Sequence, residues 1–272
     1  MRMFVPAAAL LVLLLSAAPA PATVIFTASG PGADGASLSA SAAFTISGNT
    51  LTVLLSNIAT SDNTSSGQDV PGNLLTGILF DLPDSISLAP QSALIPAGSF
   101  IVQASECNPG PCSSSTTNVG GEFIYGTSAA FGTGAPSGPD RGIASAGYIG
   151  GPAGNFCASG CPNLDNPAAP NGMNFGIISL DPSFNPNGGL DDEPVIKNSV
   201  QFQLLISGGT LTEDQISHVI FQYGTGFNEP RLVCCDRPPT ERVPGPATAV
   251  LLGSALLVVG AVRRINRRGQ AG

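Results

Sequence analysis

The chain has no tryptophan, only three tyrosines and a single histidine, and charged residues make up only 10% of its 272 residues. The scarcity of aromatic rings argues against a carbohydrate site built on ring stacking. Ten basic against 18 acidic residues disfavour nucleic acid as a partner, because binding to phosphates needs clustered basic side chains. A single histidine also leaves little material for a zinc site or a catalytic triad.

Glycine and proline are abundant instead, with 34 and 24 copies. Both are poor helix formers, so the composition excludes an all-helical bundle. Hydrophobic residues at 43%, combined with little charge, exclude a wholly disordered chain. We therefore predict an all-β fold, an antiparallel β-sandwich with long loops rich in Gly, Pro, Ser and Asn.

The N-terminus reads as a secretory signal peptide over residues 1–22. Arg2 precedes an apolar run from Phe4 to Leu15, and small residues including Ala20 and Ala22 follow. This arrangement predicts cleavage before Thr23, and the apolar run is too short for a membrane span of about 20 residues. We expect the protein to be exported.

The C-terminus, residues 243–272, carries a second signal. Val243, Pro244, Gly245 and Pro246 lead into an uncharged segment at 247–262, and Arg263, Arg264, Arg267 and Arg268 follow. Counted from Val243, these 20 residues are long enough for a transmembrane helix, and the arginines predict a cytoplasmic end. Proline cannot continue a helix from its amide side, so we expect the tetrapeptide to stay extended.

This tripartite layout resembles the PEP-CTERM sorting signal of Gram-negative surface proteins, which exosortases process. The family usually has glutamate between the two prolines, where this chain has Gly245. The resemblance implies an exosortase-type membrane protease or transpeptidase as partner, transient anchoring in the inner membrane, and release to the cell surface. The alternative is an ordinary C-terminal membrane anchor.

The segment between these signals, an exported domain over 23–236 and a linker over 237–242, is strongly acidic. All 18 acidic residues and only five basic ones lie within it, a net charge of −13. Its clearest local pattern is the alternation at 38–47, followed by Gly48-Asn49 and a return at 50–55, which predicts a hairpin. The predicted register places Ile46 opposite Leu51 and Phe44 opposite Val53.

Other segments read as strands between turn residues, and 104–170 reads as long loops. Leu211–His218 predicts one or two helical turns capped by Thr212. The predicted strands are 23–27, 74–82, 99–103, 122–125, 174–180, 199–206 and 219–223. The pieces 44–51, 75–81 and 219–226 are also similar to domains that precede PEP-CTERM signals, which implies a surface or biofilm-matrix protein.

Six cysteines fall into three pairs along the chain, and in an exported protein this predicts disulfides. Short turn-like spacers separate the first two pairs, whereas the third pair is adjacent and leaves partners elsewhere open. Zinc ligation is the alternative, but the spacings do not fit it. The disulfide candidates are Cys107, Cys112, Cys157, Cys161, Cys234 and Cys235.

Two further parts of the chain carry side chains capable of chemistry. His218 has Asp214 four residues before it, yet no nucleophile elbow surrounds any serine, so we predict a surface position and no enzyme activity. An acid-rich loop offers oxygen ligands, but Pro186 stands where an EF-hand needs glycine, which leaves a non-EF calcium site as the open alternative. Its candidate ligands are Asp181, Asn185, Asn187, Asp191, Asp192 and Glu193.

These patterns predict a non-enzymatic exported protein of the cell surface or extracellular matrix, associated with biofilm or exopolysaccharide and processed by an exosortase-type system. The alternative function is a calcium- or carbohydrate-binding surface module held by a plain membrane anchor. No cofactor other than calcium is indicated.

Overall fold

The computed structural model describes residues 22–107, 112, 117–128, 134–146, 153–157, 161, 164, 173–181, 183–187 and 189–235. These residues all lie within Ala22–Val243, which forms one compact unit. Their structure is all-β, and the helical turns among them are short 3-10 segments. These turns are η1 (Ala33–Gly35), η2 (Pro71–Asn73), η3 (Ala104–Glu106) and η5 (Glu213–Gln215).

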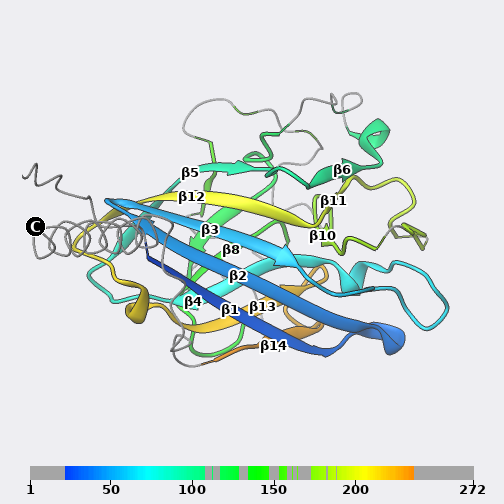
Figure 1. Cartoon of the computed structure of the whole chain (residues 1–272), viewed down its shortest axis with the longest axis horizontal. Helices are drawn as coiled ribbons and strands as arrows, with labels where there is room; N and C mark the ends of the chain where they lie inside the picture. The colour runs from blue at the N-terminus through cyan, green and yellow to red at the C-terminus, as the bar shows by residue number, and fades with distance from the viewer. Residues whose placement is uncertain are drawn as a thin grey trace, which may run out of the picture. The chain divides into compact units, whose positions relative to one another are not determined.

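The first sheet has five strands in the order β1-β2-β3-β12-β5, and every neighbouring pair is antiparallel. Figure 1 shows its long strands running side by side. The strands are β1 (Ala22–Pro31), β2 (Ser37–Ser47), β3 (Thr50–Asn57), β12 (Ser199–Ser207) and β5 (Ser87–Leu94).

The second sheet has nine strands, with the order β6-β11-β10-β4-β8-β7-β9 and with β13 and β14 branching from β4. All of its pairs are antiparallel except β10 and β11, which run parallel. The strands are β6 (Phe100–Val102), β11 (Val195–Lys197), β10 (Ile177–Ile178), β4 (Leu75–Asp81), β8 (Arg141–Ala144), β7 (Ile124–Thr127), β9 (Ala153–Asn155), β13 (Ser217–Tyr223) and β14 (Arg231–Val233).

Aromatic side chains join the two sheets in one core. Phe44 on β2 contacts Phe26 on β1 and Phe80 on β4, with ring centroids 5.5 and 5.3 Å apart. Phe202 on β12 packs in the same way against Phe123 and Phe156, at 5.0 Å each. All six of these rings are almost completely buried. The inner faces therefore meet, as in a sandwich.

The predicted hairpin is confirmed together with its register. Ile46 pairs with Leu51, Phe44 with Val53 and Thr45 with Thr52. Gly48 has a φ of 60° at the first turn position, which is the conformation that a type II′ turn demands and that glycine adopts without steric cost. Strict alternation then buries one face of both strands.

The outward face of the first sheet is uncharged. None of its five strands contains an acidic or basic residue, although the segment around them is strongly acidic. Hydroxyl groups form pairs across neighbouring strands, with Thr23 and Thr45 2.8 Å apart and Ser29 and Ser39 2.7 Å apart. The charge of the domain is therefore concentrated in its loops and in the second sheet.

Several short elements differ from the sequence prediction. Strands β5, β8, β9, β11 and β14 were not expected, and β7 begins two residues later than the predicted segment at 122–125. In β5, Pro90 interrupts the alternation of hydrophobic and polar residues that would predict a strand. Proline is tolerated there because β5 is an edge strand and its pairing with β12 shifts in register next to Pro90. The helical turn predicted at 211–218 is limited to η5, because Ser217 and His218 already belong to β13.

No helix within the described residues is long and apolar enough to cross a membrane. The predicted span at 247–262 lies outside these residues.

Candidate functional site

The cysteines lie in the three pairs that neighbour one another in the sequence. The Cα atoms are 5.5 Å apart in the first pair and 5.6 Å apart in the second, within the usual range for disulfides. In the third pair the Cα atoms are 3.8 Å apart, the spacing of adjacent residues. The pairs, consistent with the predicted disulfides, are Cys107–Cys112, Cys157–Cys161 and Cys234–Cys235.

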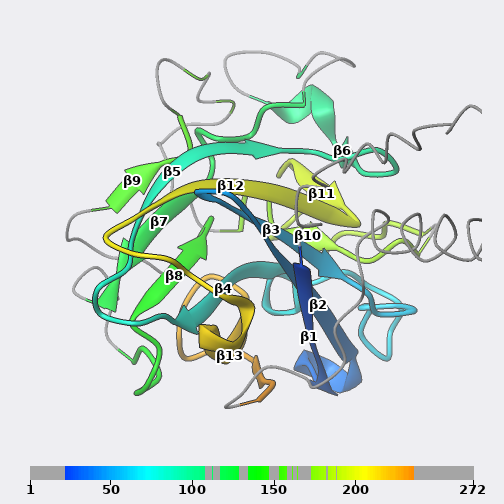
Figure 2. The same ribbon diagram turned by 60° about the vertical axis from the view of Figure 1, so that its left-hand side comes forward.

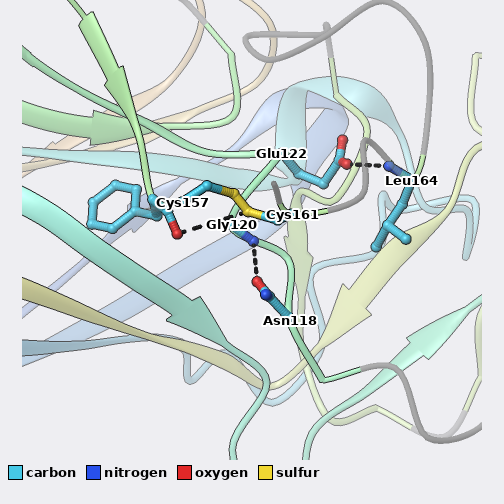
Figure 3. Close-up of a disulfide and its surroundings, with 7 residues drawn as sticks. Asn118, Gly120, Glu122, Cys157, Cys161 and Leu164 are labelled. Atoms are coloured by element: carbon cyan, nitrogen blue, oxygen red, sulfur yellow. Dashed lines mark hydrogen bonds between the residues drawn. A yellow bond between two sulfur atoms is a disulfide. The ribbon is translucent and has the colours of Figure 1, made fainter. Parts of the chain in front are cut away.

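The Cys157–Cys161 disulfide lies close to Gly120 and Glu122 (Figure 3). Cys157 forms a β-bridge with Ser92 of β5. Beside the disulfide, the buried Glu122 accepts a hydrogen bond of 2.6 Å from the backbone N–H of Leu164. Gly120 passes so close to Phe156 that a Cβ atom there would collide with the phenylalanine carbonyl oxygen. The bridge between Cys157 and Ser92 thus connects the segment just after β9 to β5, and these two strands flank a hollow described below.

We expect mass spectrometry of the unreduced protein to find linked peptides joining Cys107 to Cys112 and Cys157 to Cys161. Replacing Cys157 and Cys161 by serine should lower the free energy of unfolding by about 2 kcal/mol, because a short loop loses its cross-link in the unfolded chain. Quantitative alkylation of all six thiols without a reductant would contradict this prediction.

The acid-rich loop that offered calcium ligands is held by the protein's own hydrogen bonds. Oδ1 of Asp181 accepts hydrogen bonds from the backbone N–H and the hydroxyl of Ser183, at 3.0 and 2.9 Å. Nδ2 of Asn185 donates to the carbonyl of Gly67. The backbone carbonyl of Asp191 accepts from Gln103, while the side chains of Asn187, Asp191 and Asp192 are exposed. Among the described residues, no three His, Cys, Asp or Glu side chains converge to hold a metal ion.

Asp69 is the residue that organises this loop, and the sequence did not single it out. Oδ2 of Asp69 accepts a hydrogen bond of 2.7 Å from the backbone N–H of Asn185, and its carbonyl accepts one of 2.9 Å from Asn187. Asp69 is 3% exposed, and burial raises the pKa of its carboxyl, with only partial compensation from the Asn185 hydrogen bond. A buried acidic side chain at the base of the loop therefore holds the loop's backbone in place.

A second buried acid, Asp62, joins three segments of the fold. Its carboxylate accepts hydrogen bonds from Asn57 Nδ2 at 2.9 Å, from the Ser179 N–H at 2.9 Å and from the Ser179 hydroxyl at 2.8 Å. Its carbonyl accepts from Asn73 Nδ2 at 3.0 Å. Burial raises the pKa of Asp62 although these hydrogen bonds lower it in part. The network connects the end of β3 with the segment after β10.

His218 lies on β13 with a φ of 48°, a left-handed conformation that is uncommon outside glycine. Its Nδ1 is 2.6 Å from Oδ2 of Asp81 at the end of β4, and its side chain is 45% exposed. The other oxygen of Asp81 accepts a hydrogen bond of 2.7 Å from the backbone N–H of Asp140. His218 is thus a surface residue, as the sequence predicted.

Next to Asp81, Asp140 and Arg141 form an ion pair with an Nη1–Oδ2 distance of 2.6 Å. Nη1 also donates to the carbonyl of Asp140, and Nη2 donates to the carbonyl of Ile86 at 3.2 Å. Burial raises the pKa of Asp140, the Arg141 guanidinium opposes this, and the Asp81 carboxylate adds to it. These contacts hold Arg141, whose side chain is only 13% exposed, in one orientation at the start of β8.

Arg141 lines a hollow of about 460 Å³ between β5 of the first sheet and β7, β8 and β9 of the second. Figure 2 shows β5 and β9 at the same end of the molecule. The polar groups along it are Ser87, Tyr125, Thr127 and Arg141, and the remaining lining residues among those described are Leu88, Ala89, Pro90 and Gly154. A guanidinium surrounded by hydroxyl groups and an apolar wall suits a small polar ligand.

The predicted sorting residues, Val243, Pro244, Gly245 and Pro246, lie outside the described residues. So does the arginine cluster of Arg263, Arg264, Arg267 and Arg268.

Comparison with protein-family models, with curated proteins and with solved structures finds no match. Sequence reasoning missed Asp62, Asp69 and Arg141, because acids and bases in polar loops usually lie on the surface. Only the pairing of distant strands places these side chains in the interior.

Proposed function

We propose that the protein is a non-enzymatic, exported protein of the cell surface or extracellular matrix, delivered by an exosortase-type sorting system. The observation that carries the proposal is the order of features along the chain. An apolar leader precedes the all-β body, and Val243 to Pro246, an apolar segment and an arginine cluster follow it. Such an arrangement places the body outside the inner membrane and the arginines in the cytoplasm.

Two properties of the body support this proposal. The first is its set of three cysteine pairs at bonding distance, since disulfides persist in oxidising compartments such as the periplasm and the cell exterior. The second is the distribution of charge, with an uncharged sheet face on a strongly acidic domain. The acidic surface favours solubility, and the uncharged face permits close approach to neutral material in a matrix.

C-terminal peptide mapping of the protein from its native host tests the sorting step. We expect the mature C-terminus to lie near Pro244 to Ala247, and the peptide containing Arg263 to Arg268 to be missing from surface material. The reason is that the extended tetrapeptide is accessible to a membrane-embedded protease, while the apolar segment serves only as a temporary anchor.

A matched pair of variants separates motif recognition from anchoring. Replacing Pro244 and Pro246 together by alanine should abolish processing and leave the full chain in the inner membrane. Replacing Arg242 by glutamine, just before the motif, should leave processing unchanged. Surface-exposed protein that retains Arg263 to Arg268 would show instead that the segment is an ordinary anchor.

A further inference from the structure

The hollow between β5 and β9 holds a guanidinium with unused hydrogen-bonding capacity. Arginine has about five N–H donors, and three of those on Arg141 are occupied by Asp140 and Ile86. The remaining two, on Nε and Nη2, have no partner among the described residues. A neighbouring pair of N–H groups on one planar guanidinium matches the two oxygens of a carboxylate.

The other polar groups of the hollow are hydroxyls that can donate to the same ligand. Tyr125 is 7% exposed, and burial raises the pKa of its hydroxyl to about 12, so it stays protonated at neutral pH. Within the part of the chain that the structure describes, this hydroxyl has no hydrogen-bond partner. Ser87 and Thr127 add two further hydroxyls, and none of the described residues that line the hollow is acidic.

The remaining wall and the size of the hollow limit the ligand further. Pro90 and Gly154 pack against each other in its wall, and a Cβ atom at Gly154 would lie 3.1 Å from the proline ring, so glycine permits this close approach. About 460 Å³ is within the range of sites for small organic molecules. The apolar wall suits the ring carbons of a ligand, whereas the hydroxyl groups suit a hydroxylated ring.

Charge decides between a singly and a doubly charged anion. Arg141 is already paired with Asp140, and Asp81 lies beside that pair. A dianion such as phosphate would bring a second negative charge to a site with one shared cation, in a domain that is acidic overall. A single carboxylate needs only the bidentate contact that Arg141 still offers.

We infer that this hollow is a binding site for a carboxylate-bearing hydroxylated ring of sugar size, of which a hexuronic acid is the simplest example. Arg141 binds the carboxylate, and Tyr125 donates a hydrogen bond to the ring. The assignment does not depend on how the chain is sorted, because the sorting experiment measures the C-terminus and the binding experiment measures the hollow.

Titration of the purified full-length protein with glucuronate, glucose and acetate, followed by calorimetry and by saturation-transfer NMR, tests the assignment. Glucuronate should bind at least about tenfold more tightly than glucose, which lacks the carboxylate, and than acetate, which lacks the ring. Glucose binding as tightly as glucuronate would overturn the role of Arg141. Acetate binding as tightly as glucuronate would overturn the role of the ring, and the absence of any binding would overturn the site.

Variants assign the contacts to their residues. Tyr125→Phe removes only a hydroxyl that has no described partner, so it should weaken glucuronate binding about three- to tenfold without changing the melting temperature. Arg141→Lys keeps the charge but loses the planar pair of N–H groups, and should weaken binding about tenfold or more. Arg231→Lys, on the exposed strand β14, is the matched control and should bind as the wild type does. Unchanged binding in both Tyr125→Phe and Arg141→Lys would refute the proposal.

Discussion

Replacing Phe44 by alanine should lower the free energy of unfolding by about 3 to 5 kcal/mol, the range for a fully buried aromatic side chain. Phe44 is inaccessible to solvent and contacts Phe26 within its own sheet and Phe80 in the opposite sheet. Its removal therefore leaves a cavity between the sheets and breaks two edge-to-face ring contacts, each of which adds about 0.5 to 1.5 kcal/mol.

Denaturant unfolding of the purified full-length protein measures this loss. Phe44→Leu should be intermediate, because leucine fills part of the cavity, and it keeps the test usable if the alanine variant does not fold. Phe100→Ala is the matched control, since Phe100 is 52% exposed on the short strand β6 and should cost less than about 1 kcal/mol. Equal losses at positions 44 and 100 would contradict the role of Phe44 as the contact between the sheets.

The hairpin around Gly48 could be predicted because every signal for it is local. Alternation over β2 and β3 fixes which face is buried, and a two-residue turn fixes which residues pair. Similar local patterns found β12, in which hydrophobic and polar residues largely alternate, and β4 and β13, each of which contains three consecutive hydrophobic residues. These elements account for the inner part of the core.

The strands around the hollow could not be predicted in this way. Strands β8 and β9 are only four and three residues long and contain glycine, and β5 contains Pro90. Such segments are strands because longer strands pair with them, and pairing between distant segments leaves no periodic pattern in the sequence. For the same reason the sequence could not place Arg141 beside Tyr125.

The acid-rich loop is held by contacts that its own composition does not reveal. Its carboxylates and amides are typical calcium ligands, yet within the described residues the loop's backbone is bound by Asp69, which is more than a hundred residues earlier. Asp62 in the same way binds Ser179 across 117 positions. A buried carboxylate that pairs with backbone N–H groups looks, in sequence, like any solvated acid of a polar loop.

Replacing Asp62 by alanine should destabilise the protein by about 3 to 5 kcal/mol, because each buried donor left without an acceptor costs about 1 to 3 kcal/mol. The amide of Asn57 and both donors of Ser179 lose their partner in this variant. Asp62→Asn keeps the shape and one acceptor oxygen but places an NH₂ group against these donors, so its cost should be smaller, about 1 to 3 kcal/mol.

The same carboxyl should make stability depend on pH in an unusual direction. Because burial raises the pKa of Asp62 in the folded state above its ordinary value of 3.8, the folded protein binds this proton more tightly than the unfolded chain does. Its contribution is therefore fully present below pH 3.8 and is lost as the pH rises through the folded-state pKa. Asp69 acts in the same direction, whereas Asp181, whose pKa is lowered by hydrogen bonds from Ser183, opposes it.

Denaturant unfolding at a series of pH values from about 4 to 7 separates these contributions, since the slope of stability against pH counts the protons released on unfolding. In the wild type the free energy of unfolding should fall as the pH rises over this range. In Asp62→Asn the fall should be smaller, because the Asp62 carboxyl, one of the groups with a raised pKa, is absent. Asp84→Asn, in the exposed turn between β4 and β5, is the matched control and should keep the wild-type slope. A wild-type slope in Asp62→Asn would show that the buried network is not the source of the pH dependence. A reduced slope, together with the loss of stability in Asp62→Ala, would identify Asp62 as a proton-linked contact between β3 and the loop after β10.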